Sequence, residues 1–348
     1  MTKKVVTICS TDWHLRKDNI EQIKSLITQK CELAKTYHID TVFCLGDVFD
    51  SRPGQSVSTL SGLYEILDIF SSYSIRLVII PGNHDKQDYS GVESFSSPFR
   101  DHKSLMYVDQ AGGVPIKNFF FHLLPFFKEE EWKRRFSELC KYIRPFDKNK
   151  KHILLSHIAI NGSVNNDGSK IDCGIAIGDF KEFDLVLLGH YHNQQQVGPN
   201  IFHIPCIKQN NFGEDSDKGF TLVYDDLSLE LVKSEFKGYE KIVIDLDKIS
   251  KKDLSNLTRE YSNSEKFVRF EFIGDSELVR SINKEELISL GIDVKIKVKE
   301  IEQTIEYANE EVKKYNQNSI IEEFKKFCTE KEKDFEKGVT FLSKKLSL

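Results

Sequence analysis

The sequence predicts an α/β protein whose first part contains a buried, largely parallel sheet. Two features indicate this fold class. Short apolar runs typical of buried strands alternate with stretches in which apolar residues recur every three or four positions, as in amphipathic helices. After residue 241 the alternation restarts on a smaller scale, which indicates a compact βαβαβ unit. With 348 residues, the chain has room for one large domain and a smaller one.

The elements of the first part follow one another in a regular order. We expect strands at 3–9, 41–45, 75–80, 104–108, 119–126, 152–157 and 184–190. Helical spacing of apolar residues predicts helices at 18–37, 57–71 and about 128–144. After residue 190 the pattern changes to two hairpins, with Gly-Pro-Asn and Asp-Asp-Leu as their turns.

The second part continues the same pattern and then becomes helical. The βαβαβ unit contains predicted helices at 253–262 and 276–290. We therefore divide the chain into a main domain at 1–240, a small α/β cap at 241–299, a polar linker at 300–317 and a helical tail at 318–348. In the tail, apolar residues recur at helical spacing in two groups. They are Ile320, Ile321, Phe324, Phe327 and Cys328, then Phe335, Val339, Leu342 and Leu346.

Composition excludes several classes of protein. Hydrophobic residues make up 39% of the chain, so it can build a core and is neither disordered nor fibrous. No apolar run approaches the roughly 20 residues of a membrane span, and no signal peptide is visible, so we expect a cytoplasmic protein without membrane contact. The seven cysteines are scattered and indicate reduced thiols. The net charge of −5 does not indicate a nucleic-acid binder, so a phosphate substrate would need bound cations.

Five polar motifs each follow the end of a predicted strand. In α/β sheets, ligands bind beyond the carboxyl ends of the strands, so we expect the motifs to converge on one site. The glycines in three of the motifs allow sharp turns that aim the next side chain inward. The motifs are Asp12-Trp13-His14, Gly46-Asp47-Val48-Phe49-Asp50, Gly82-Asn83-His84-Asp85, Ser156-His157 and Gly189-His190-Tyr191-His192.

The residue types in these motifs indicate a metal site. Asp, Asn and His without Cys suit Mn, Fe or Zn better than calcium or an iron–sulfur cluster. Seven candidate ligands are too many for one open catalytic metal and suit two metals that share a carboxylate. The candidates are Asp12, His14, Asp47, Asn83, His157, His190 and His192. The remaining histidines match no motif, and we expect them in the core or on the surface: His38, His102, His122, His152 and His203.

The ordered motifs D-x-H, G-D, G-N-H-[DE], H and G-H-x-H resemble the calcineurin-like metallophosphoesterases across residues 1 to about 240. The resemblance implies a four-layer αββα sandwich with two metals at one edge. It implies that Asp12, His14 and His192 hold one metal, that Asn83, His157 and His190 hold the other, and that Asp47 bridges them. His84 would face the scissile phosphate without binding metal, and Asp85 would orient His84.

Further details resemble the nuclease subunits of recombination and double-strand-break-repair complexes, the SbcD type. These details are GDVFDSRP, His14-Leu15 and the late KGFTLVYDD hairpin. Two positions depart from that type: Asp50, where some members carry His, and Arg16-Lys17, where many have Gly. The resemblance implies a DNA exo/endonuclease that uses two divalent metals, Mn²⁺ first and Mg²⁺, Fe²⁺ or Zn²⁺ as alternatives.

The same resemblance implies partners. We expect DNA, an SMC-like coiled-coil ATPase bound through the C-terminal tail, and a second copy of the chain. The alternative for the tail is that it folds back on the cap. The candidate face for the second copy comprises Leu60, Leu63, Ile66 and Leu67, although core packing explains the same pattern. The candidate contacts with DNA phosphates flank the metal motifs: Arg16, Lys17, Arg52 and Lys86.

Two other functions compete with a nuclease. A phosphomonoesterase or small-molecule phosphodiesterase would use the same metal chemistry, but small substrates need neither the cap nor the tail. A non-catalytic scaffold on the same fold would be expected to lose a metal ligand, and all seven candidates are present.

Overall fold

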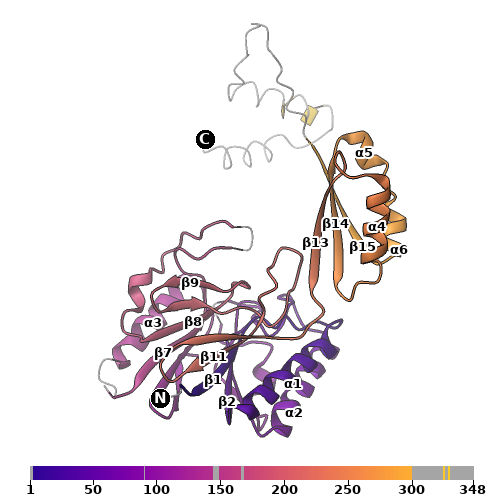
Figure 1. Ribbon diagram of the computed structural model, residues 1–348. Coiled ribbons are helices and arrows are strands. Elements are labelled where there is room, and N and C mark those ends of the chain that lie inside the picture. The colour runs from indigo at the N-terminus through magenta and orange to yellow at the C-terminus, as the bar shows by residue number, and fades with distance from the viewer. Residues whose placement is uncertain are drawn as a thin grey trace. The chain divides into compact units, whose positions relative to one another are not determined.

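The computed structural model describes residues 3–89, 91–143, 149–165 and 168–299, together with 324, 325, 328 and 329 (Figure 1). The chain divides into two compact units, Met1–Lys299 and Glu300–Leu348. The predicted linker at 300–317 lies outside the described residues. So does the predicted tail at 318–348, apart from the four residues above. The linker, the tail and the domain boundary at 240 therefore stay predictions.

The first sheet contains six strands in the order β12-β11-β1-β2-β3-β4. Its centre is parallel, as expected from the helices that connect its strands, and β11 pairs antiparallel with both β1 and β12. The strands are β1 (Val5–Ser10), β2 (Thr41–Cys44), β3 (Arg76–Ile79), β4 (Leu105–Tyr107), β11 (Gly219–Tyr224) and β12 (Leu229–Lys233).

The second sheet also contains six strands, in the order β5-β6-β7-β8-β10-β9. Strands β6, β7, β8 and β10 are parallel, while β5 and β9 are antiparallel edges. Strand β5 was not predicted, because its Gly-Gly and Pro are poor strand formers. The strands are β5 (Gly112–Ile116), β6 (Phe119–Leu124), β7 (Lys151–His157), β8 (Leu185–Gly189), β9 (Gln195–Gly198) and β10 (Ile201–His203).

The two sheets pack face to face between two layers of helices. Apolar side chains of both sheets, among them Phe43, Phe121 and Leu187, form the central core. Helices α1 (Ile20–Thr36) and α2 (Val57–Ser72) bury their apolar sides against the outer face of the first sheet. Helix α3 (Glu129–Ile143) and the 3₁₀ turn η2 (Ile177–Phe180) cover the second sheet; a further 3₁₀ turn, η1, spans Ser97–Phe99. The predicted four-layer sandwich is confirmed (Figure 1).

Residues 239–298 form a third sheet with its own apolar cluster. Strands β13 (Tyr239–Asp245), β14 (Phe267–Gly274) and β15 (Ile292–Val298) are all parallel, which confirms the predicted βαβαβ unit. Helix α4 (Lys251–Tyr261) lies close to its predicted range. The single helix predicted at 276–290 is wrong: the structure has α5 (Ser276–Arg280) and α6 (Lys284–Ser289). The break occurs because Asn283, a favoured N-cap residue, accepts a hydrogen bond from the backbone N–H of Glu286.

Helix α2 does not offer the dimer face predicted for it. Leu63, Ile66 and Leu67 are fully buried against the first sheet and α1, and Leu60 packs on the same cluster. The outward side of the helix carries Tyr64 instead, which is 52% exposed. The prediction of this face was wrong because an apolar stripe at helical spacing looks the same whether it faces a core or a partner.

The histidines outside the motifs lie where packing explains them. His122, His152 and His203 are buried, and His38 is exposed. Within the described residues, no helix is both long and apolar enough to cross a membrane.

Candidate metal centre

The loops that carry the five motifs meet at the carboxyl ends of β1, β2, β3, β7 and β8. Backbone hydrogen bonds join the first two loops, from Asp12 N–H to Gly46 O (2.9 Å) and from His14 N–H to Asp47 O (3.1 Å). Side chains join the others: His84 N–H donates to Asp47 Oδ1 (2.8 Å) and His190 N–H donates to Asp12 Oδ2 (3.1 Å). The two carboxylates therefore hold neighbouring loops together as well as facing the site.

Two glycines allow these loops to approach so closely. Gly46 has φ +91°, a left-handed conformation that favours glycine. A Cβ at Gly82 would lie 2.2 Å from Asp47 Oδ1, so no larger residue fits there. The predicted sharp turn is therefore found at Gly46, while the lack of a side chain at Gly82 allows the Asp47 carboxylate to lie against its backbone.

Four of the seven candidate ligands have left-handed backbone conformations. The φ angles are 52° for Asp12, 47° for His14, 50° for Asp47 and 90° for His190. Such conformations are uncommon for residues other than glycine, and they persist only where the surroundings impose them. Their concentration at one end of the sheets marks this end as the functional one.

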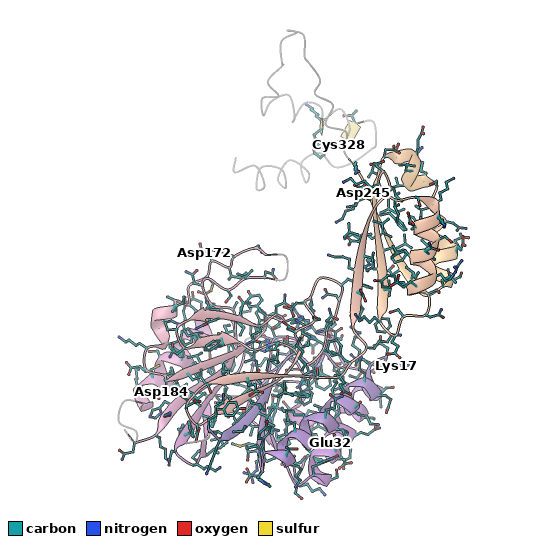
Figure 2. The ribbon with its side chains drawn as sticks, viewed as in Figure 1. Lys17, Glu32, Asp172, Asp184, Asp245 and Cys328 are labelled. Carbon is teal, nitrogen blue, oxygen red and sulfur yellow. The ribbon has the colours of Figure 1, made fainter. Side chains whose placement is uncertain are left out.

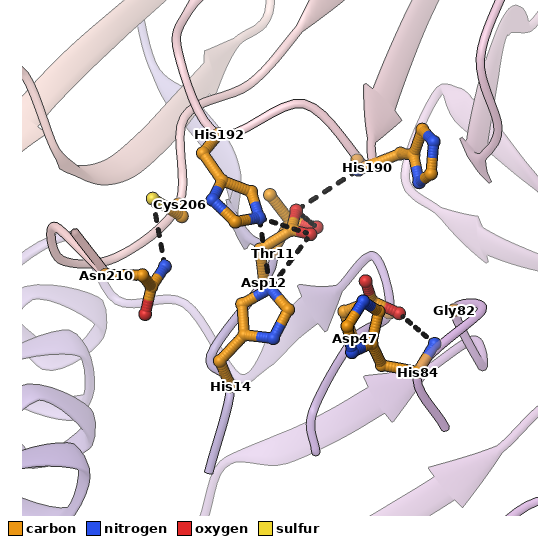
Figure 3. Close-up of polar contacts among 12 residues, drawn as sticks. Thr11, Asp12, His14, Asp47, Gly82, His84, His190, His192, Cys206 and Asn210 are labelled. Atoms are coloured by element: carbon orange, nitrogen blue, oxygen red, sulfur yellow. Dashed lines mark hydrogen bonds and ion pairs between the residues drawn. The ribbon is translucent and has the colours of Figure 1, made fainter. Parts of the chain in front are cut away.

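Asp12, His14 and His192 form a first group of ligand atoms (Figure 3). Nε2 of His14 and Nε2 of His192 lie 3.0 Å apart, and each is 3.7 Å from Asp12 Oδ1. Among the described residues, the buried Asp12 Oδ1 has no hydrogen-bond partner. A buried carboxylate oxygen without a donor, facing two imidazole nitrogens, fits a divalent cation.

Asp47, Asn83, His157 and His190 form a second group. Asn83 Oδ1 lies 3.1 Å from His157 Nε2 and 2.9 Å from His190 Nδ1, and Asp47 Oδ2 is 3.4 Å from His157 Nε2. The Nδ1–H of His157 donates to Leu45 O (2.6 Å), so Nε2 is the ring nitrogen directed into the group. The structure thus brings together all seven predicted ligands, in the two sets that the resemblance implied.

The charges within these groups balance one another. Burial would raise the pKa of Asp47, but the His157 imidazole beside it lowers that pKa to about 2. The pKa of Asp12 is likewise held far below its usual range against the effect of burial, by His14, His157 and His192. Burial opposes the charge on His157, yet Asp47 raises the pKa of that imidazole to about 9. These ionised carboxylates are the groups that bind a hard or borderline cation.

His84 lies between the two groups: its ring is 4.9 Å from that of His14, edge to face, and its backbone N–H donates to Asp47. Its Nδ1–H donates to Asp50 O (2.5 Å), and its Nε2 lies 2.9 Å from Arg52 Nη2.

The role predicted for Asp85, to orient the His84 ring, is wrong. The buried Asp85 carboxylate accepts the N–H groups of Phe49 (2.9 Å) and Gly82 (2.8 Å), which tie two motif loops together. The carbonyl of Asp50 orients His84 instead.

Sequence reasoning missed Glu214, which lies behind His192. Its Oε1 is 2.7 Å from His192 Nδ1, so the carboxylate accepts that proton and leaves Nε2 free for metal. Glu214 is 6% exposed and also accepts from Asn210 N–H (3.0 Å) and Asn211 Nδ2 (2.9 Å). No local pattern distinguishes it, because it stands 22 positions from His192 in an irregular polar loop.

The four candidate DNA contacts differ in their exposure. Lys17, which is labelled in Figure 2, is exposed. Arg52 is also exposed, and Arg16 is half-buried. Lys86 is fully buried, and its ammonium group donates to Phe126 O (2.7 Å) and Gly91 O (3.1 Å). The prediction for Lys86 is therefore wrong: a buried ammonium committed to backbone carbonyls does not reach a DNA phosphate.

Comparison with known proteins agrees with this geometry. Residues 6–194 match the model of the family described as calcineurin-like phosphoesterase. The chain is 26% identical to the D subunit of the nuclease SbcCD of Staphylococcus saprophyticus over 62% of this chain and 64% of that protein, just under two thirds of its length. It is 24% identical to the protein of the same name from Staphylococcus epidermidis, over 92% of each chain. It is also 24% identical to "Exonuclease subunit 1" of Enterobacteria phage T4, over 71% of this chain and 73% of that protein.

Proposed function

The chain belongs to the calcineurin-like phosphoesterase family, and from that premise we propose that it is a two-metal DNA nuclease acting in DNA recombination, repair or replication. One observation carries the proposal: seven Asp, Asn and His side chains from five loops converge in two adjoining groups. The relatives named as nuclease and exonuclease subunits support DNA as the substrate.

We assign Asp12, His14 and His192 to one metal and Asn83, His157 and His190 to the other, with Mn²⁺ as the proposed ion. Two such ions supply an acidified water and a clamp on the phosphate oxygens. Asp47 is the proposed shared ligand, because its buried carboxylate lies in the second group and its backbone oxygen accepts the N–H of His14, a member of the first (3.1 Å).

His84 is the proposed proton donor to the leaving oxygen. In the present arrangement Nδ1–H is donated to Asp50 O, so Nε2 presents a lone pair to the Arg52 guanidinium. Burial lowers the pKa of His84, which keeps the free imidazole neutral. A phosphate that accepts from Arg52 in place of His84 would free Nε2 to take up a proton from the solvent and to donate it to the leaving oxygen. Arg52, Arg16 and Lys17 are the proposed phosphate contacts.

The protein is further proposed to act with an SMC-like ATPase and as a homodimer. The staphylococcal relatives are named as subunits, which supports a partner chain. Truncation after Gln317 tests whether the tail binds the ATPase: the shortened protein should keep Mn²⁺-dependent activity but no longer co-purify with it. Retained co-purification would favour a tail that folds back. A strictly monomeric species in sedimentation at tens of micromolar would contradict the dimer.

The decisive experiment offers the purified protein Mn²⁺ with linear duplex DNA, single-stranded DNA and an aryl phosphate diester side by side. We expect cleavage of DNA, abolished by a chelator. Hydrolysis of the aryl diester without any cleavage of DNA would support the small-molecule phosphodiesterase instead. Absence of hydrolysis with two metals bound would support a scaffold.

A further inference from the structure

Two half-buried aromatic rings lie side by side at the edge of the metal centre. Tyr89 belongs to the loop that follows Asp85, and Phe126 follows the end of β6. Their ring centroids are 5.3 Å apart and the planes meet at 81°, an edge-to-face pair. The next residue, Phe127, is fully buried in the core, whereas these two rings keep part of their surface exposed.

The pair adjoins both the second metal group and the proposed phosphate contact. The Phe126 ring lies 6.5 Å from the His190 ring, with 24° between the planes, and 6.4 Å from the His157 ring. The Tyr89 ring lies 6.0 Å from the guanidinium carbon of Arg52, whose Nη2 is 2.9 Å from His84 Nε2. Aromatic surface, guanidinium and metal ligands therefore follow one another along one rim.

The buried Lys86 fixes the two rings relative to each other. Its ammonium group donates to Phe126 O and to Gly91 O, and so ties the Tyr89 loop to the Phe126 backbone. It also lies 3.8 Å from the centre of the Phe127 ring. A buried ammonium without these acceptors would be costly, so the loop is held where the rings meet. The rings are thus placed before any substrate arrives.

We propose that Tyr89 and Phe126 form a stacking platform for a nucleobase of the DNA, next to the scissile phosphate. The inference rests on the proposed nuclease function and deepens it. A base is joined to its phosphate through one sugar, so a phosphate at the metals brings its base to the rings that line them. Every base has a π-face, so the platform accepts any sequence, and it favours a strand whose bases are unpaired.

The test compares two single strands with Mn²⁺: one with all bases present and one with a window of abasic tetrahydrofuran residues. The wild type should cleave the intact strand about tenfold faster, in kcat/KM, than the abasic window. Tyr89→Leu should cut the intact strand about tenfold more slowly, leave the abasic rate unchanged and keep the wild-type metal content. Tyr89→Phe should behave as wild type, because stacking needs only the ring.

The matched control is Tyr64→Leu on α2. Tyr64 also packs edge-on against another ring, that of His102, with centroids 5.3 Å apart, but among the described residues His102 belongs to none of the groups of metal-ligating side chains. This variant should cleave both strands at the wild-type rates.

Each contrary outcome has its own meaning. Cleavage by Tyr89→Leu with an unchanged ratio between the two strands would overturn the platform alone. If Tyr89→Leu lost its bound metal as well as both cleavage rates, Tyr89 would have a structural role and the platform would be overturned. A wild-type protein that binds metal and cleaves neither strand would overturn the nuclease proposal, and the platform with it.

Discussion

Two histidine clusters in the same sandwich differ in the groups that surround the imidazoles. The metal centre gathers four imidazoles with two buried carboxylates at the ends of strands. Within strands β6 and β7, His122 Nε2 and His152 Nδ1 also meet, at 2.9 Å, and both residues are buried. Among the described residues, however, this second pair belongs to no group of three or more metal-ligating side chains.

The difference lies in the surroundings of the imidazoles. At the metal centre, burial opposes charge on the imidazoles, but the neighbouring carboxylates overcome it at two of them and raise the pKa of His14 to about 10 and that of His157 to about 9. Burial prevails at His190 and lowers its pKa to about 4.

His122 lies between Phe120, Phe183 and His152, and burial lowers its pKa to about 4. Histidines thus form a candidate metal site where they lie beside carboxylate oxygens that lack a hydrogen-bond donor. They serve as core residues where they form hydrogen bonds with each other.

The largest expected effect follows from removing a carboxylate of the metal centre. Asp47→Ala should lose bound metal and activity together, because the shared ligand of both ions is gone, while the α/β core still folds. Elemental analysis, phosphodiester hydrolysis and circular dichroism measure the three quantities. The variant His152→Ala, in the other cluster, should bind as much metal at the metal centre as the wild-type protein does. Near two equivalents of metal in Asp47→Ala would refute the shared-ligand assignment.

A smaller effect is expected from a histidine beside the metals. His84→Ala should keep both metals and still bind DNA, but cleave it at least about 10²-fold more slowly, as for a missing general acid. Single-turnover cleavage and elemental analysis check the two parts of this expectation. His122→Ala should leave the rate per folded molecule unchanged. If His84→Ala lost metal, His84 would be a ligand and the assignment of roles would be wrong.

A change to the carboxylate that accepts a hydrogen bond from a ligand should lower the affinity for metal without touching the metal itself. Glu214→Gln replaces the acceptor of His192 Nδ1–H, and metal affinity should fall about 10- to 100-fold. Titration of the metal-free protein with Mn²⁺ measures this affinity. The matched control is Asp184→Asn, because Asp184 Oδ2 accepts the backbone N–H of His152 (2.7 Å) in the other cluster. Equal affinities in the two variants would remove Glu214 from the metal centre.

The smallest effect concerns stability in acid. The pKa of His122 is about 4 in the folded protein and about 6.5 in the unfolded chain, so the unfolded chain binds the proton more readily. The stability that the neutral imidazole contributes is complete above pH 6.5 and is lost as the pH falls towards 4, by about 3 kcal/mol at most. His122→Leu should show a smaller loss between pH 7 and pH 5 in urea unfolding. For His38→Asn, at an exposed position, the free energy of unfolding should fall between pH 7 and pH 5 by as much as it does for the wild type.

The sequence predicted the fold well, because each layer depends on a pattern that is local in the chain. The apolar runs of β1, β7 and β8 and the helical spacing in α1 mark their buried faces directly. Strand β5 was missed since pairing with β6, not its own residues, makes it a strand. The helix break at Asn283 is a cap that only the folded chain distinguishes from an exposed helical position.

The candidate site was predicted as a set of residues but not as a set of contacts. The five motifs predicted seven candidate ligands, and the structure brings their side chains together, since strand ends converge in any α/β sheet. The contacts of Asp85, Lys86 and Glu214 depend on which groups lie across the loops, and on burial that charge alone does not reveal. The apolar stripe of α2 was ambiguous too, because a helix face that packs on the core and one that packs on a partner chain both carry apolar residues at the same spacing.

The left-handed backbone at Asp12, His14, Asp47 and His190 has an evolutionary consequence. Each such residue costs of order 1–3 kcal/mol, against a net stability of about 5–15 kcal/mol for a whole protein. Selection for stability alone would favour glycine at His14 and His190. The carboxylates of Asp12 and Asp47, in contrast, also accept hydrogen bonds that join neighbouring loops. A lineage released from the demand for metal chemistry would therefore drift towards glycine at the two histidine positions first, and would become more resistant to heat as it lost its activity.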